Sequence, residues 1–135
     1  MTVTHEYETI RLLDEPTRAA IEIAVAQWVG SERCTSAARE RLLELGASRD
    51  DVERYRRGDA NDPARRVLLR FAVTTLIARG RVHATDFGRM RPRPSDALLA
   101  EVAAVTARAF LRATLAESLG VHAEAPPLAM AIGDY

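Results

Sequence analysis

Residues 14–46 read DEPTRAAIEIAVAQWVGSERCTSAARERLLELG, and this stretch decides the fold. Asp14 comes two residues before Pro16, which predicts a capped helix start, because proline is tolerated in a first turn. Residues 16–29 are then apolar on nearly every side. This pattern predicts a helix that is buried inside the molecule or covered by another subunit. Gly30 predicts the end of that helix.

A second helix should follow at once, with Ser31 as its cap, residues 32–45 as its body and Gly46 at its end. Further along the chain, capping and breaking residues predict four more helical segments. They are a short helix from Ser48 through Tyr55, a longer one from Pro63 to about Arg79, a short turn after His83 or Thr85 that holds Phe87 and Met90, and a long one over Ala97–Leu119 with the apolar line Leu98, Val102, Val105, Ala109, Ala113 and Ala116.

The composition agrees with a helical protein. The chain has 135 residues, of which 24 are alanine and 13 are glycine or proline, and its aromatic content is 5%. Alanine is the best helix former, whereas glycine and proline are the worst. We therefore predict a single all-α domain over residues 1–135 with five to seven helices and an Ala- and Pro-rich tail at 123–135.

Charge and residue usage exclude several function classes. All 19 cationic residues are arginine, so lysine Schiff-base chemistry and a P-loop lysine are excluded. The 19 acidic residues balance them, which argues against nucleic-acid binding through bulk charge. No apolar run reaches the length of a membrane span and the first ten residues lack the features of a secretory signal, so we expect a cytoplasmic protein without membrane contact.

Cysteine and histidine are too sparse for a recognisable metal site. Cys34 is the one cysteine, which excludes an intrachain disulfide, and the three histidines show no metal-ligand spacing. We expect neither a metal nor a cofactor.

Two residues are candidates for chemistry. Cys34 would be the third residue of its helix, where free N–H groups and the positive helix end stabilise a thiolate. The alternative is a small residue that fills a contact between helices. Glu22 interrupts an apolar helix, and if buried it would have a raised pKa and could act as an acid or base. The alternative is a surface ion pair with Arg18, one turn away.

These residues suggest where a site would lie. We predict a cavity between the end of the 16–29 helix and the start of the next, lined by Glu22 and Cys34 as catalytic residues and by Gln27 and Ser31 as binding residues. A polar group on an apolar helix needs a partner or a ligand. The alternative is that Glu22 pairs outside the cavity and Gln27 contacts a neighbouring loop.

The stretch AVAQWVGSERCTSAA at 24–38, followed by LGAS at 45–48, resembles the core of the AhpD-like, carboxymuconolactone decarboxylase superfamily. The similarity continues through Asp62-Pro63, LLRFA at 68–72, RGRV at 79–82 and residues 108–121, and covers about residues 7–122. It implies an AhpD-like helical bundle. Redox-active members carry a CxxC motif, a following histidine and an upstream acidic residue. Cys34 matches the second cysteine, whereas Ser31, Ala38 and Ala19 occupy the other three positions.

The resemblance therefore implies a divergent member without dithiol peroxidase chemistry, which binds a small molecule or a partner. One alternative is a one-cysteine, thiol-dependent peroxidase or reductase that uses Cys34 and an external thiol. A second alternative is a cofactor-free lyase or isomerase of the carboxymuconolactone decarboxylase type, which requires a base and an anion-binding arginine in one pocket. The family and the apolar 16–29 helix together predict a homo-oligomer, from dimer to hexamer.

Overall fold

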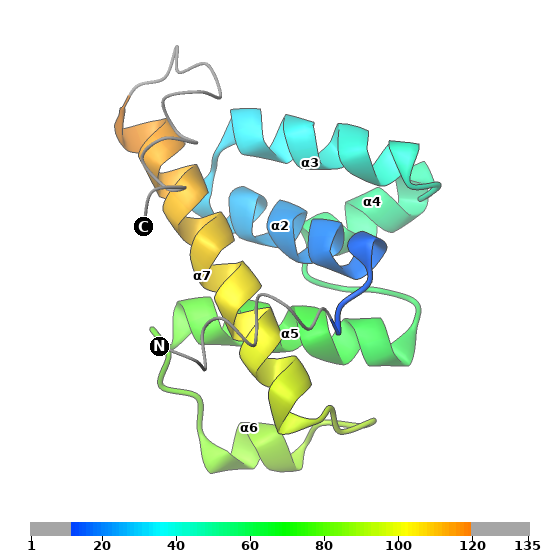
Figure 1. The fold of residues 1–135 in the computed structure, drawn as a ribbon, viewed down its shortest axis with the longest axis vertical. Coiled ribbons are helices and arrows are strands. Elements are labelled where there is room, and N and C mark those ends of the chain that lie inside the picture. The colour runs from blue at the N-terminus through cyan, green and yellow to red at the C-terminus, as the bar shows by residue number, and fades with distance from the viewer. Residues whose placement is uncertain (1–11, 120–135) are drawn as a thin grey trace.

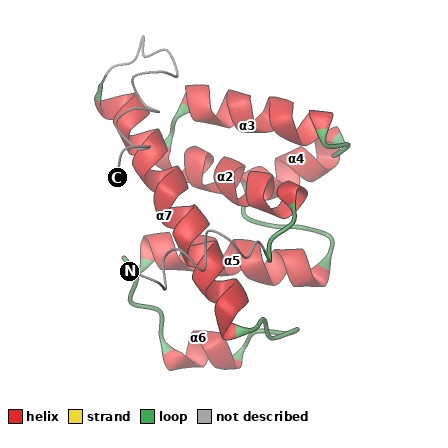
Figure 2. Cartoon of the chain, in the orientation of Figure 1, coloured by secondary structure: helices red, strands yellow, loops and turns green. Residues whose placement is uncertain are grey.

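The computed structural model describes residues 12–119, and within that range it contains six α-helices and no strand (Figures 1 and 2). The predicted all-α fold of five to seven helices is confirmed. The predicted tail at 123–135 lies outside the described residues. The helices are α2 (Glu15–Val29), α3 (Glu32–Glu44), α4 (Arg49–Arg56), α5 (Pro63–Ile77), α6 (Ala84–Gly88) and α7 (Asp96–Ser118).

Helix α2 lies at the centre and packs against α3, α4, α5 and α7. Its start is fixed by Asp14, whose side chain accepts a hydrogen bond from the backbone N–H of Thr17 at 2.8 Å. Its end is fixed by Gly30, which takes the left-handed conformation with φ 89°. The prediction of a buried helix is confirmed, since the apolar residues of α2 from Ala19 to Ala26 are almost completely shielded from solvent.

Helix α7 crosses α2 and α5 and is the longest in the described part of the chain (Figure 1). The predicted apolar line faces inward: Val102, Val105, Ala113 and Ala116 are buried, and the remaining two members are partly buried. Alanine at positions 109, 113 and 116 allows this half of α7 to approach α2 and α3 closely.

A buried carboxylate attaches the segment before α2 to α7. Glu101 on α7 is 4% exposed. Its two oxygens accept hydrogen bonds from the backbone N–H groups of Leu12 at 2.9 Å and Leu13 at 2.5 Å. Because both N–H groups precede the helix, the carboxylate satisfies donors that would otherwise be left unpaired close to the core.

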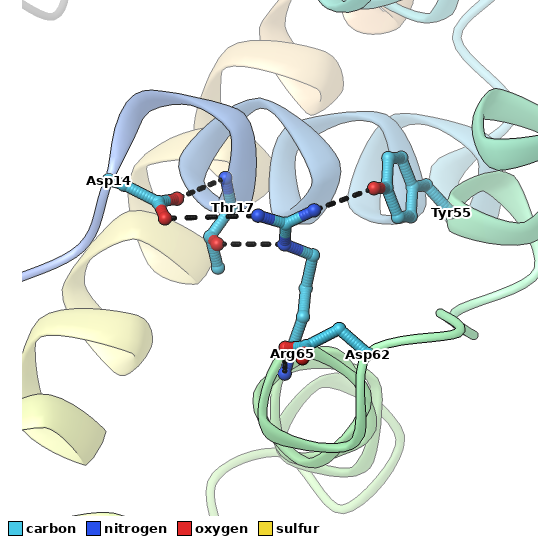
Figure 3. Close-up of polar contacts among 5 residues, drawn as sticks. All are labelled: Asp14, Thr17, Tyr55, Asp62 and Arg65. Carbon is cyan, nitrogen blue, oxygen red and sulfur yellow. Dashed lines mark hydrogen bonds and ion pairs between the residues drawn. The ribbon is translucent and has the colours of Figure 1, made fainter. Parts of the chain in front are cut away.

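Arg65 joins three helices (Figure 3). From α5 it donates to the hydroxyl of Thr17 on α2 at 3.0 Å and to the hydroxyl of Tyr55 on α4 at 2.8 Å, and it pairs with Asp14 at 3.8 Å. Although burial raises the pKa of Asp14, the hydrogen bonds from Thr17 and the charge of Arg65 lower that pKa overall. Both hydroxyl partners belong to buried residues.

The helix ends differ from their predicted positions by at most two residues. Helix α5 ends at Ile77 rather than near Arg79, because Arg79 and Gly80 both take positive φ angles of 53° and 82° and so cannot continue an α-helix. Among residues 12–119, no helix has the length and apolar character needed to cross a membrane.

Candidate functional site

Two adjoining cavities lie between α2, α3 and α7, and we call them together the α2–α7 cleft. The arginine cavity has a volume of about 370 Å³ and the cysteine cavity about 190 Å³. They share four lining residues, Glu22, Arg41, Ala109 and Arg112. The arginine cavity adds Glu15, Arg18, Val105 and Arg108, and the cysteine cavity adds Ala26, Cys34, Ala37 and Ala38.

Glu22 lines both cavities of the cleft. Its side chain is 28% exposed, and a carboxylate oxygen lies 3.6 Å from the guanidinium of Arg112 on α7. Burial raises the pKa of Glu22, and the charges of Arg112, Arg18 and Arg41 only partly oppose this effect. The structure thus pairs Glu22 with Arg112, across two helices, whereas Arg18 acts on it through its charge without a close ion pair.

Positive charge exceeds negative charge in the arginine cavity. Arg41 is hydrogen-bonded to Glu15, and Arg112 is paired with Glu22, which accounts for both carboxylates of the lining. Arg18 and Arg108 remain without an ion pair among the residues that the structure describes. The Nε atom of Arg18 is moreover buried and has no hydrogen-bond partner. An N–H donor in this position is unfavourable unless an acceptor reaches it.

Cys34 lies where the sequence predicts it, at the third position of α3. The side chain of Ser31 caps the helix by accepting a hydrogen bond from the Cys34 backbone N–H at 3.2 Å. Cys34 is half-buried and lines the cysteine cavity together with four alanines. Because alanine side chains are short, they leave space between α2, α3 and α7 beside the thiol.

The structure brings together two of the four predicted site residues. Glu22 and Cys34 line one cavity. Ser31 is completely buried and serves as the helix cap, so it does not line the cleft. Gln27 is exposed and points to α4, where its carbonyl oxygen accepts hydrogen bonds from Nε and Nη2 of Arg56 at 2.9 and 2.8 Å. Gln27 thus lies outside both cavities and makes a contact between helices.

Of the arginines around Glu22, Arg18 was expected from the sequence, whereas Arg41, Arg108 and Arg112 were not. Arg108 and Arg112 lie one turn apart on α7, and Arg18 and Glu22 lie one turn apart on α2, so each pair shares one helix face. That spacing was visible in the sequence. The crossing of α7 over α2, which brings the two faces together, was not.

Within residues 12–119, no group of three or more histidine, cysteine, aspartate or glutamate side chains is arranged to hold a metal ion. Comparison of the chain with protein-family models, curated proteins and solved structures finds no match.

Proposed function

We propose that the protein binds a small organic anion in the α2–α7 cleft, in keeping with the hypothesis of a divergent AhpD-like protein that lacks dithiol peroxidase chemistry. The observation that carries the proposal is the excess of positive charge in the arginine cavity, where four guanidinium groups face two carboxylates and Arg18 has an Nε without a hydrogen-bond partner. A ligand carboxylate would accept hydrogen bonds from the guanidinium groups that line the cavity and would balance the excess charge. Charge-assisted bonds between arginine and carboxylate are among the strongest polar contacts in proteins.

The size of the cleft supports a ligand larger than an inorganic ion. The arginine cavity of about 370 Å³ falls within the usual range of small-molecule pockets. The adjoining cysteine cavity is walled largely by alanine methyl groups, which suit an apolar part of the ligand. A carboxylate on a compact hydrocarbon body fits this combination.

Titration calorimetry with a panel of small carboxylates tests the proposal, with benzoate and its neutral counterpart benzamide as the first pair. We expect benzoate to bind and benzamide to bind at least tenfold more weakly. Arg18→Gln should weaken benzoate binding at least tenfold. Arg57→Gln is the matched control, because Arg57 is exposed and lines none of the described cavities. Equal affinity of Arg18→Gln and the control, or equal binding of the acid and the amide, would contradict the proposal.

A second candidate is acid–base catalysis on the bound anion, of the cofactor-free lyase or isomerase kind. It is favoured by the combination of Glu22, whose pKa is raised by burial, with Arg41 and Arg112 in one cavity. A carboxyl with a raised pKa is suited to proton transfer near neutral pH, and the guanidinium groups would stabilise negative charge that develops on the substrate. Glu22→Gln tests this second candidate. The variant should keep its affinity for the anion in either case, and if the protein is a catalyst, the variant should also lose turnover.

The one-cysteine alternative depends on Cys34, which shares its cavity with Glu22. A single cysteine cannot form an internal disulfide, so peroxide turnover would require an external thiol. Peroxide turnover that requires an added thiol and that Cys34→Ser abolishes would favour this alternative over anion binding.

A further inference from the structure

A third cavity lies on the other side of α5 and shares no lining residue with the α2–α7 cleft. We call it the α5–α6 pocket, and its volume is about 400 Å³. One wall is a single face of α5, where the lining residues Arg66, Val67, Arg70, Phe71 and Thr74 follow the three- and four-residue spacing of a helix face. The other wall is formed by α6 and the residues on either side of it.

The inner surface of the pocket is apolar. Phe71 and Met90 are each 8% exposed and belong to the hydrophobic core, and Val67 and Val82 pack against that core. A ligand in the pocket would therefore contact hydrocarbon and aromatic groups that are already held in place by the fold. Such a surface favours an apolar ligand body.

The outer edge of the pocket is positively charged. Four arginines line it, namely Arg66, Arg70, Arg89 and Arg91. Asp86 is the one carboxylate among the described lining residues, and it already accepts a hydrogen bond from the backbone N–H of His83 at 3.2 Å. The pocket thus has a strong excess of positive charge.

The four arginines differ in the ion pairs and hydrogen bonds that their side chains make within the protein. Arg66 is paired with Asp59 at 2.9 Å. Arg91 donates to the backbone carbonyl oxygens of Gly88 and Met90, which hold its side chain in place without balancing its charge. Arg70 and Arg89 are exposed, and among residues 12–119 their side chains form no hydrogen bond and no ion pair within 4 Å.

We infer that the α5–α6 pocket binds a small amphiphilic anion, whose apolar body lies on Phe71 and Met90 and whose acidic group is held by Arg70 and Arg89. The apolar floor disfavours a fully hydrophilic anion such as sulfate, which would leave it without contacts. The cationic edge disfavours a neutral hydrocarbon, because the acidic group supplies the charge-assisted hydrogen bonds. This inference is independent of the function proposed for the α2–α7 cleft.

The first measurement uses 8-anilinonaphthalene-1-sulfonate, a fluorescent amphiphilic anion, with the full chain. We expect saturable binding that octanoate displaces, whereas sulfate and octan-1-ol displace the dye at least tenfold less effectively. Near-ultraviolet circular dichroism checks that the protein remains folded, because the dye also binds loosened cores. Displacement by sulfate or by octan-1-ol as effective as displacement by octanoate would overturn the assignment.

The second measurement locates the dye. Arg70→Gln combined with Arg89→Gln should weaken dye binding at least tenfold, and since both side chains are exposed, the variant should fold. Arg57→Gln is the charge-matched control and should bind as the wild type does. Unchanged binding by the double variant overturns the proposal, and weakening by Arg18→Gln in its place would put the dye in the α2–α7 cleft.

A third experiment distinguishes a free amphiphilic anion from a membrane lipid with the same chemistry. Co-sedimentation with phosphatidylglycerol vesicles should be absent. Vesicle binding that depends on Arg70 and Arg89, without displacement of the dye by octanoate, would overturn the assignment to a small molecule.

Discussion

The protonation of Glu22 should be visible in the stability of the protein. Burial raises its pKa above the ordinary value of 4.5, so the folded chain binds this proton more tightly than the unfolded chain does. Its contribution to stability is therefore fully present below pH 4.5 and is lost as the pH rises through the raised pKa.

Glu22→Gln cannot ionise and should not suffer this loss. We expect the melting temperature of the variant, relative to that of the wild type, to rise with pH above about 4.5 and then to level off. Thermal melts from about pH 4 to 8 test this. Glu40→Gln, at an exposed position of α3, is the control and should follow the wild type. A variant that loses stability relative to the wild type as pH rises would show that the ion pair with Arg112 outweighs burial.

Glu101 has a structural role that a neutral isostere should not fill. Both of its oxygens accept backbone N–H groups, from Leu12 and Leu13, whereas glutamine has one acceptor and would place an N–H₂ group against a donor. We expect Glu101→Gln to lower the free energy of unfolding by about 1–3 kcal/mol, as measured by urea denaturation. Glu117→Gln, at an exposed position of the same helix, should change it by less than about 0.5 kcal/mol. Equal effects of the two substitutions would contradict this role.

At the scale of the elements, Arg65 is the contact that holds α2, α4 and α5 in register (Figure 3). Arg65→Met would leave the hydroxyls of Thr17 and Tyr55 without their guanidinium donor in a buried environment. We expect a loss of about 2–4 kcal/mol in the free energy of unfolding, because hydrogen bonds to charged groups contribute more to stability than hydrogen bonds between neutral groups.

Two further variants define the origin of that loss. Arg65→Lys should recover it only in part, since an ammonium group cannot reach both hydroxyls with the fork of a guanidinium. Arg66→Met removes an exposed ion pair and one hydrogen bond to the carbonyl oxygen of Ala60, one residue along the same helix, and should cost less than Arg65→Met. A loss for Arg65→Met no larger than the loss for Arg66→Met would show that the contact does not hold the helices together.

The helices could be predicted well because their ends are encoded locally. Asp14, Ser31, Ser48 and Ser95 each cap a helix through a side-chain hydrogen bond, and such caps can be recognised from residue type and position.

The location of Glu22 and Cys34 at one cavity also followed from local reasoning, because α2 and α3 are consecutive. The position of Gln27 was predicted wrongly because its contact depends on how α4 packs against α2. Arg112 was missed because α7 is distant from α2 in the sequence.

At the scale of the molecule, the structure changes the basis of the predicted homo-oligomer. The apolar surface of α2 was the reason to expect a second subunit, and α3, α4, α5 and α7 cover that surface within one chain. The prediction now depends on apolar residues that stay exposed, among them Trp28 at 49% and Ile77 at 64%. Helices α2 and α5 run side by side in the same direction, so the ends that carry these residues lie at one side of the molecule (Figure 1).

We expect the protein to self-associate at micromolar concentration through this side. Trp28→Glu combined with Ile77→Glu should then sediment as a monomer, because charge at an apolar contact opposes association and neither exposed position is needed for folding. Sedimentation velocity of both proteins is the measurement. A wild-type protein that is monomeric at these concentrations would rule out the oligomer.

The position of α2 among four other helices also determines how the molecule opens. No neighbour can leave α2 without exposing core, whereas α6, a helix of five residues, has no buried residue of its own. Backbone amides of α2 should therefore exchange with deuterium only during global unfolding, and those of α6 should exchange through small local openings. The slowest exchange rates in α2 would then measure the stability of the whole protein, so that any substitution that weakens the core, wherever it lies, should be detected first as faster exchange in this one helix.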